Sequence, residues 1–107
     1  MDVGTDENFP TLVLAAELPV VVDFWAPHCQ PCIGINRILA ELAPQYSGKL
    51  AFVSVNVEMA PEVAATYGVR GLPHLVLFAG GHITLTRLGT LSRKALEALL
   101  AEAAKNF

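Results

Sequence analysis

The stretch that decides the fold is Asp23-Phe24-Trp25-Ala26-Pro27-His28-Cys29-Gln30-Pro31-Cys32, which holds the only two cysteines of the 107-residue chain. It leaves an apolar, β-branched segment, Val20–Trp25, of the kind typical of a central strand buried on both faces. It then enters a helix that we expect to begin near Gln30, because a proline fits the first helical turn. Cys29 therefore meets unpaired backbone N–H groups and the positive end of the helix dipole, which favour thiolate over thiol. Cys32 follows one turn later, within reach of a disulfide, so the stretch predicts a redox centre.

Composition indicates one compact domain spanning residues 1–107. Hydrophobic residues make up 53% of the chain and charged residues 16%, which suits a domain that buries roughly 60–70% of its unfolded surface. The net charge of −3, without a Lys/Arg cluster, gives no sign of a nucleic-acid partner, and no apolar run approaches the ~20 residues of a membrane span. Residues 1–6 contain neither a basic nor an apolar signal segment, so we expect a cytoplasmic location.

The other segments alternate between helix and strand patterns. We expect a first helix over about residues 6–17, capped by Thr5, before the strand 20–25. A second helix should begin at residue 30 and be kinked by Pro44, and a strand over 50–57 and a short helix over 61–67 should follow it. A hairpin of strands 74–78 and 83–88 and a helix capped by Ser92 come last. Parallel β-α-β followed by an antiparallel hairpin implies an α/β fold: a central mixed β-sheet flanked by helices on both faces.

With this order of elements, the chain resembles thioredoxins over nearly its whole length. The matching stretches are 22–26, 29–32, 67–73, Phe78 with Gly81, and 88–92. The resemblance implies a thiol–disulfide oxidoreductase that reduces protein disulfides, with Cys29 as nucleophile and Cys32 as resolving thiol. The position of Cys29 at the helix start, with Cys32 a turn further inside, leads to the same assignment. The alternative is that both cysteines are inert core residues.

Asp23 is the most anomalous residue, a carboxyl within an apolar strand. Burial would raise its pKa, and a raised pKa suits a proton acceptor for Cys32 near neutral pH. Thioredoxins place a buried aspartate here, commonly with a lysine nearby, but the matching position in this chain is Ser54. We therefore expect Asp23 to ionise less readily. The alternative is that Asp23 points to solvent from a strand end.

The resemblance also implies a substrate-binding surface. Leu72-Pro73 matches the cis-proline turn whose preceding backbone pairs with the substrate chain, whereas the residues alone favour an ordinary trans turn. The implied substrate-binding residues are Trp25, His28, Gly71, Leu72, Pro73 and Gly89. His28 stands where thioredoxins usually carry tryptophan. A cationic histidine there would favour the thiolate and a more oxidising disulfide; an exposed one would have little effect.

The partners that the resemblance implies are disulfide-containing proteins and a thioredoxin-reductase-like electron donor, an NADPH-dependent flavin reductase. We expect a monomer, active in electron transport and cell redox homeostasis, with no bound cofactor, because the chain has neither G-x-G-x-x-G nor a phosphate loop.

Three alternative functions remain open at this level. One is a thiol oxidase or disulfide isomerase of the same fold, which His28 supports. Another is a metal-binding module that uses His28, Cys29, Cys32 and His74. The last is a binding scaffold without redox activity.

Overall fold

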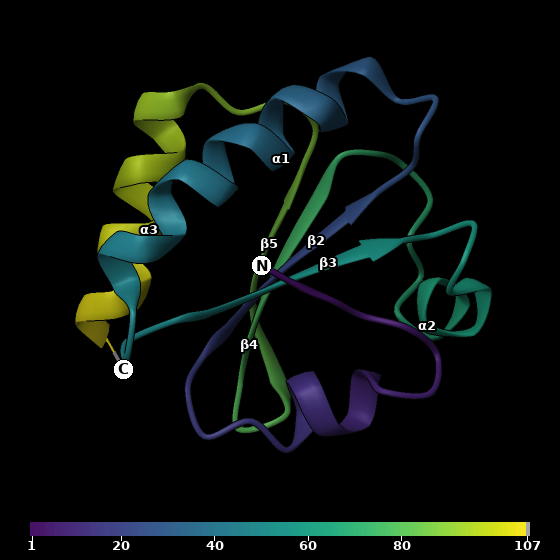
Figure 1. The fold of residues 1–107 in the computed structure, drawn as a ribbon, viewed down its shortest axis with the longest axis horizontal. Coiled ribbons are helices and arrows are strands. Elements are labelled where there is room, and N and C mark those ends of the chain that lie inside the picture. Colours follow the sequence, from purple (N-terminus) through teal and green to yellow (C-terminus); the bar gives the residue numbers. More distant parts are fainter. Residues whose placement is uncertain (107) are drawn as a thin grey trace.

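A computed structural model describes residues 1–106; Phe107, the last residue of the predicted domain, lies outside the described residues. Five strands form one sheet in the order β1-β3-β2-β4-β5. They are β1 (Asp2–Val3), β2 (Val20–Trp25), β3 (Ala51–Asn56), β4 (His74–Ala79) and β5 (His82–Leu88). The first three run parallel, while β4 is antiparallel to both of its neighbours, so the predicted mixed sheet is confirmed (Figure 1).

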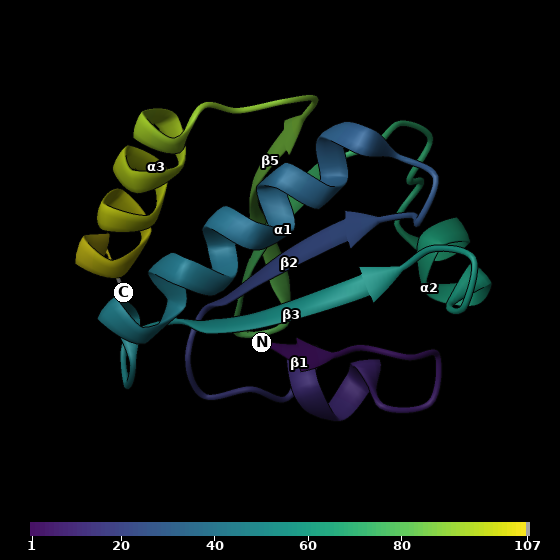
Figure 2. The same cartoon turned by 45° about the horizontal axis from the view of Figure 1, so that its top comes forward.

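Helices cover both faces of this sheet. The helices α1 (Gln30–Leu42) and α3 (Arg93–Asn106) pack on one face, and Figure 2 shows α1 lying along β2. The other face is covered by η1 (Pro10–Leu14), a π-helical turn, and α2 (Pro61–Thr66). Side chains of β2 alternate between two apolar clusters, one on each face, so this strand is buried on both sides as predicted. Within residues 1–106, no helix is both long and apolar enough to cross a membrane.

The first helix is shorter than predicted. Thr5 does cap a turn, because the N–H of Asn8 donates to Thr5 Oγ1 (3.1 Å) and the N–H of Thr5 donates to Asn8 Oδ1 (2.7 Å). A regular α-helix does not follow, since Pro10 has no N–H to donate. The chain instead forms one wide turn over residues 10–14, closed by the N–H of Ala15 donating to the Pro10 carbonyl (2.9 Å).

The prediction that Pro44 kinks a continuous helix is also wrong. The helix α1 ends at Leu42, and the chain tightens into a 3₁₀ turn, η2 (Ala43–Tyr46), that contains Pro44. Because Pro44 cannot donate to the carbonyl of Ala40, the α-helical ladder stops before it, and a 3₁₀ turn is a common ending.

The strand β1 was not predicted, because two residues are too few for an alternating pattern. It pairs with Val53 and Ser54 of β3, and the N–H of Gly4 extends the pairing by donating to the Ser54 carbonyl (2.8 Å). A Cβ at Gly4 would lie 2.9 Å from methyl groups of Val53 and Val55, so glycine permits this close approach.

The hairpin and the last helix agree with the predictions. Gly80 and Gly81 form the two-residue turn, with φ of 59° and 81°, values that glycine adopts at no steric cost. The Oγ atom of Ser92 accepts the N–H of Ala95 (3.1 Å) and caps α3, whose Leu96 and Leu100 are fully buried.

Candidate active site

The cysteine pair lies where β2 gives way to α1. After β2, the N–H of Cys29 donates to the Ala26 carbonyl (3.0 Å) and closes the turn that leads into the helix. Cys29 is the N-cap of α1, in extended conformation, and its Sγ accepts the N–H of Cys32 (3.3 Å). The two cysteines are joined by a disulfide, with their Cα atoms 5.3 Å apart. The predicted helix-start position of Cys29 is confirmed.

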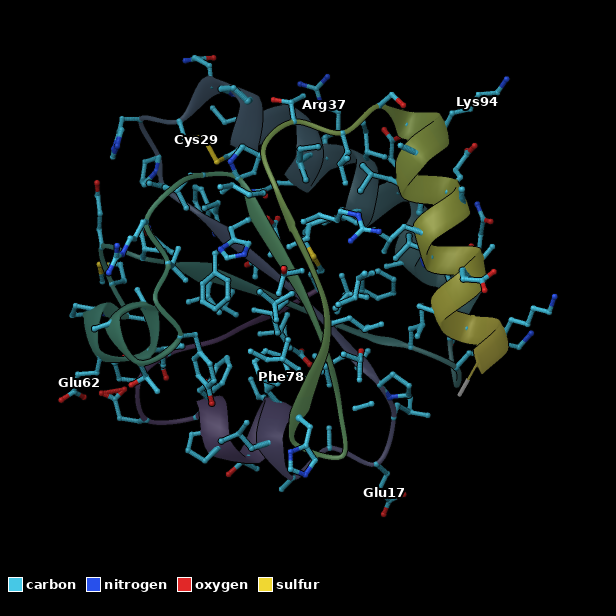
Figure 3. All side chains as sticks on the ribbon, turned by 180° about the vertical axis from the view of Figure 1, so that it is seen from behind. Glu17, Cys29, Arg37, Glu62, Phe78 and Lys94 are labelled. Atoms are coloured by element: carbon cyan, nitrogen blue, oxygen red, sulfur yellow. A yellow bond between two sulfur atoms is a disulfide. The ribbon has the colours of Figure 1, made fainter. Side chains whose placement is uncertain are left out.

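The two sulfur-bearing residues differ in exposure. Cys29 is partly exposed, whereas Cys32 has 0% of its surface exposed. In Figure 3, the sulfur of Cys29 lies near the rim of the molecule. A substrate can therefore reach Cys29, while Cys32 is enclosed and bonded to Cys29.

Asp23 is fully buried, so the alternative in which it points to solvent is wrong. It lies in β2 between Ser54 of β3 and Leu75 of β4, on the sheet face that α1 covers. Burial in this apolar setting raises the pKa of Asp23 from 3.8 to about 7. Its Oδ1 atom has no hydrogen-bond partner among the described residues.

Asn36 is a site residue that the sequence analysis missed. Its side-chain NH₂ group donates to Asp23 Oδ2 and to the carbonyl oxygen of Cys32 (3.1 Å). The Cys32 carbonyl oxygen can only accept, which assigns this arm of the amide as nitrogen rather than oxygen. The available signal was spacing, because a residue four after Cys32 shares its helix face.

The substrate-binding residues expected from the resemblance come from three distant segments. The Leu72-Pro73 bond is cis, as the resemblance implies. Phe24 pairs with His74, so Pro73 lies at the end of β2 that carries Trp25, and Figure 3 shows the segment leading into β4 passing beside Cys29. The N–H of Gly89 donates to the Pro73 carbonyl (2.8 Å), which fixes the third segment against the second.

Leu88 joins this surface and was also missed. A Cβ at Gly71 would lie 3.0 Å from a methyl group of Leu88, so the two residues are in contact. Leu88 is 67% exposed although it is a large apolar residue. We therefore define the rim of the site as Trp25, Gly71, Leu72, Pro73, Leu88 and Gly89. A groove of about 640 Å³ between α3 and the β4–β5 hairpin lies elsewhere and holds neither cysteine.

His28 points outward beside the disulfide. Its side chain is 73% exposed, and Nδ1 lies 3.0 Å from Oε2 of Glu58, an acidic partner that the sequence analysis did not foresee. An exposed pair of this kind contributes about 0–1 kcal/mol. His74 lies instead against the ring of Phe24. In the described part of the chain, no three His, Cys, Asp or Glu side chains gather as metal ligands.

The structure combines a mixed sheet, a disulfide whose first cysteine caps a helix, and a nearby cis-proline. Together these features define a class of proteins, the thiol–disulfide oxidoreductases. A family model described as Thioredoxin matches residues 1–102. The chain is 42% identical over 96 residues to "Thioredoxin C-2" of Corynebacterium nephridii, which covers 90% of this chain and 89% of that protein. For "Thioredoxin" of Pseudomonas aeruginosa the identity is 43% over 96 residues, with the same two coverages.

Plant relatives are similar but longer. "Thioredoxin M-type, chloroplastic" of Zea mays is 40% identical over 98 residues, which is 92% of this chain and 59% of that protein.

The chain belongs to the thioredoxin family, and it is a thiol–disulfide oxidoreductase that reduces disulfides.

Proposed function

We propose that the chain reduces protein disulfides by exchange through Cys29 and Cys32, with Asp23 as the proton acceptor. The observation that carries this proposal is the difference in exposure between the two cysteines, one accessible at a helix start and one enclosed. The accessible sulfur forms the bond to the substrate, and the enclosed sulfur breaks it.

The reaction has two balanced exchanges. The Cys29 thiolate attacks one sulfur of the substrate disulfide, and the other substrate sulfur leaves as a thiolate. Cys32 then loses its proton to Asp23 and attacks Cys29 Sγ, which releases the second substrate sulfur as a thiolate. Two electrons pass from the cysteine pair to the substrate, and the Cys29–Cys32 disulfide remains.

The local electrostatics support both steps. The N–H of Cys32 already donates to Cys29 Sγ in the disulfide form, and the same donor and the helix dipole would stabilise a thiolate. Burial raises the pKa of Asp23 to about 7, so a large share of molecules holds a deprotonated base at neutral pH.

The substrate in this proposal is an extended protein segment. Leu72 would pair with it through backbone hydrogen bonds, like an added strand, while the exposed apolar side chain of Leu88 would contact its side chains. His28, which is exposed next to Cys29 in the chain, would contact the substrate or the electron donor.

The wider setting is part of the same proposal. Residues 1–107 would form a single domain and act as a monomer in the cytoplasm, where the chain takes part in electron transport. It would bind no cofactor and would receive its electrons from an NADPH-dependent flavin reductase.

The insulin-reduction assay driven by dithiothreitol tests the roles of the cysteines. We expect Cys29→Ser and Cys32→Ser to lose catalysis, and only Cys32→Ser to accumulate a mixed disulfide, because it retains the attacking sulfur. Lys94→Ala, on the exposed side of α3, serves as the control and should keep the wild-type rate (Figure 3). Catalysis by Cys29→Ser would contradict the proposal.

The direction of exchange has its own measurement. A reduction potential near about −270 mV supports a reductase, and one near about −120 mV would instead indicate an oxidase. The ion pair between His28 and Glu58 lies beside Cys29. Glu58→Gln removes this pair, so a difference in reduction potential between this variant and the wild type would reveal an effect of His28.

A further inference from the structure

We propose that Asn36 is a positioning residue for the proton transfer from Cys32 to Asp23: its NH₂ group holds the carboxylate beside the Cys32 backbone and stabilises the charged form. This inference rests on the proposed function, in which Asp23 accepts that proton. It adds a residue that neither the sequence motifs nor the family resemblance assigns to the site.

The geometry of the amide is the first step. Asn36 lies four residues after Cys32, so α1 presents both residues to the same face of the sheet. Its NH₂ group lies between Asp23 Oδ2 and the Cys32 carbonyl oxygen. The carbonyl cannot titrate and always accepts, so it keeps the NH₂ arm in place whether or not Asp23 carries a proton.

The surroundings of Asp23 show why this donor matters. Its neighbours in the sheet, Ser54 and Leu75, are uncharged. From α1 it faces Asn36, whose amide also contacts the Cys32 carbonyl oxygen, and α3 presents leucines to this side of the sheet. Arg87 of β5 pairs with Leu75 on the same face, one strand further away and exposed. The amide of Asn36 is thus the donor in direct contact with the carboxylate.

The electrostatic effect of Asn36 opposes that of burial. Burial raises the pKa of Asp23 to about 7, because the apolar interior disfavours the charge. A hydrogen bond donated to a carboxylate favours the charged form and lowers its pKa. Asn36 therefore increases the fraction of molecules in which Asp23 is ready to accept a proton at neutral pH.

A titration of Asp23 tests this contact directly. The oxidised protein is used, so that neither cysteine titrates, and the Asp23 carboxyl is followed by ¹³C NMR from acid to alkaline pH. Asn36→Ala should raise the pKa of Asp23 by about one unit, and Asn36→Gln, which keeps an NH₂ group, by less. The control is Asn56→Ala, since the Asn56 amide oxygen instead accepts the N–H of Glu58 (2.9 Å). If the pKa of Asp23 changed no more in Asn36→Ala than in Asn56→Ala, the inference would be overturned.

A kinetic cycle then tests the role in proton transfer. Release of substrate from the mixed disulfide is measured in single turnovers at pH 7 for wild type, Asn36→Ala, Asp23→Asn and the double variant. We expect Asn36→Ala to slow release roughly fivefold, to shift its pH profile upward by about one unit, and to add nothing in the Asp23→Asn background.

The outcomes of this kinetic cycle distinguish the proposed role of Asp23 from the inferred role of Asn36. If Asp23→Asn releases substrate at the wild-type rate, the proposed role of Asp23 fails, and the inference fails with it. If Asp23→Asn slows release but Asn36→Ala does not, the inference alone is wrong. Equal slowing by Asn36→Ala in both backgrounds would show a purely structural role and would also overturn it.

Discussion

Replacing Asp23 with asparagine should stabilise the oxidised protein, and the gain should increase with pH. Burial raises the pKa of this carboxyl from 3.8 to about 7 in the folded chain, so the folded state binds the proton more tightly than the unfolded state. The wild type therefore has its full stability below about pH 4 and loses it progressively up to about pH 7. A difference of about 3 pH units, at about 1.4 kcal/mol each, gives a cost of up to about 4 kcal/mol above pH 7.

Urea unfolding of the two oxidised proteins, followed by circular dichroism, measures this difference. The advantage of Asp23→Asn should be larger at pH 8 than at pH 5, by up to about 2.5 kcal/mol. The disulfide removes both cysteines from the titration, so the change reports on the carboxyl. Glu17→Gln, which removes an exposed carboxyl, serves as the control and should change stability by less than about 0.5 kcal/mol (Figure 3). If Asp23→Asn increased the free energy of unfolding by the same amount at both pH values, the reasoning would be refuted.

Three further substitutions test the fold and the rim. In thermal unfolding, Gly34→Ala should stabilise the protein by about 0.5–1 kcal/mol, because the new methyl group meets no atom within 4 Å in the interior of α1. Gly81→Ala should destabilise it by about 1–3 kcal/mol, because φ is +81° and the Cβ would lie 3.0 Å from the Leu14 carbonyl oxygen; equal changes for the two glycines would contradict this. Leu88→Ser should slow insulin reduction severalfold while leaving the reduction of a small aromatic disulfide unchanged, and slowing of both would exclude a role in recognising protein substrates.

Much of the fold could be predicted because local signals decide it. The apolar run of β2, the Gly80-Gly81 turn and the Ser92 cap each specify their element without reference to the rest of the chain. The failures all have an identifiable cause. Pro10 and Pro44 remove backbone donors, which shortens the helices that the apolar periodicity predicted.

The site could be predicted in part, for a different reason. The cysteine spacing and the carboxyl inside an apolar strand are visible in a single segment, and the structure buries Asp23 as its position suggested. The rim depends on contacts between segments far apart in sequence. Only the family resemblance connected Pro73 and Gly89, and neither the resemblance nor the residues indicated Leu88 or Glu58 as neighbours of the site.

Asn36 shows why a pattern within one element cannot describe the environment of a buried charge. In sequence it is a polar residue on an amphipathic helix, which normally indicates a face in contact with water. The spacing from Cys32 places Asn36 on the same face of α1, but it does not identify the β2 side chain that Asn36 contacts. The expectation that Asp23 ionises less readily was based on Ser54, which stands where thioredoxins commonly carry a lysine. That expectation considered only the charged neighbours of the carboxyl. A neutral amide on the facing helix can partly replace such a cation, since a carboxylate is stabilised by any donor aimed at it.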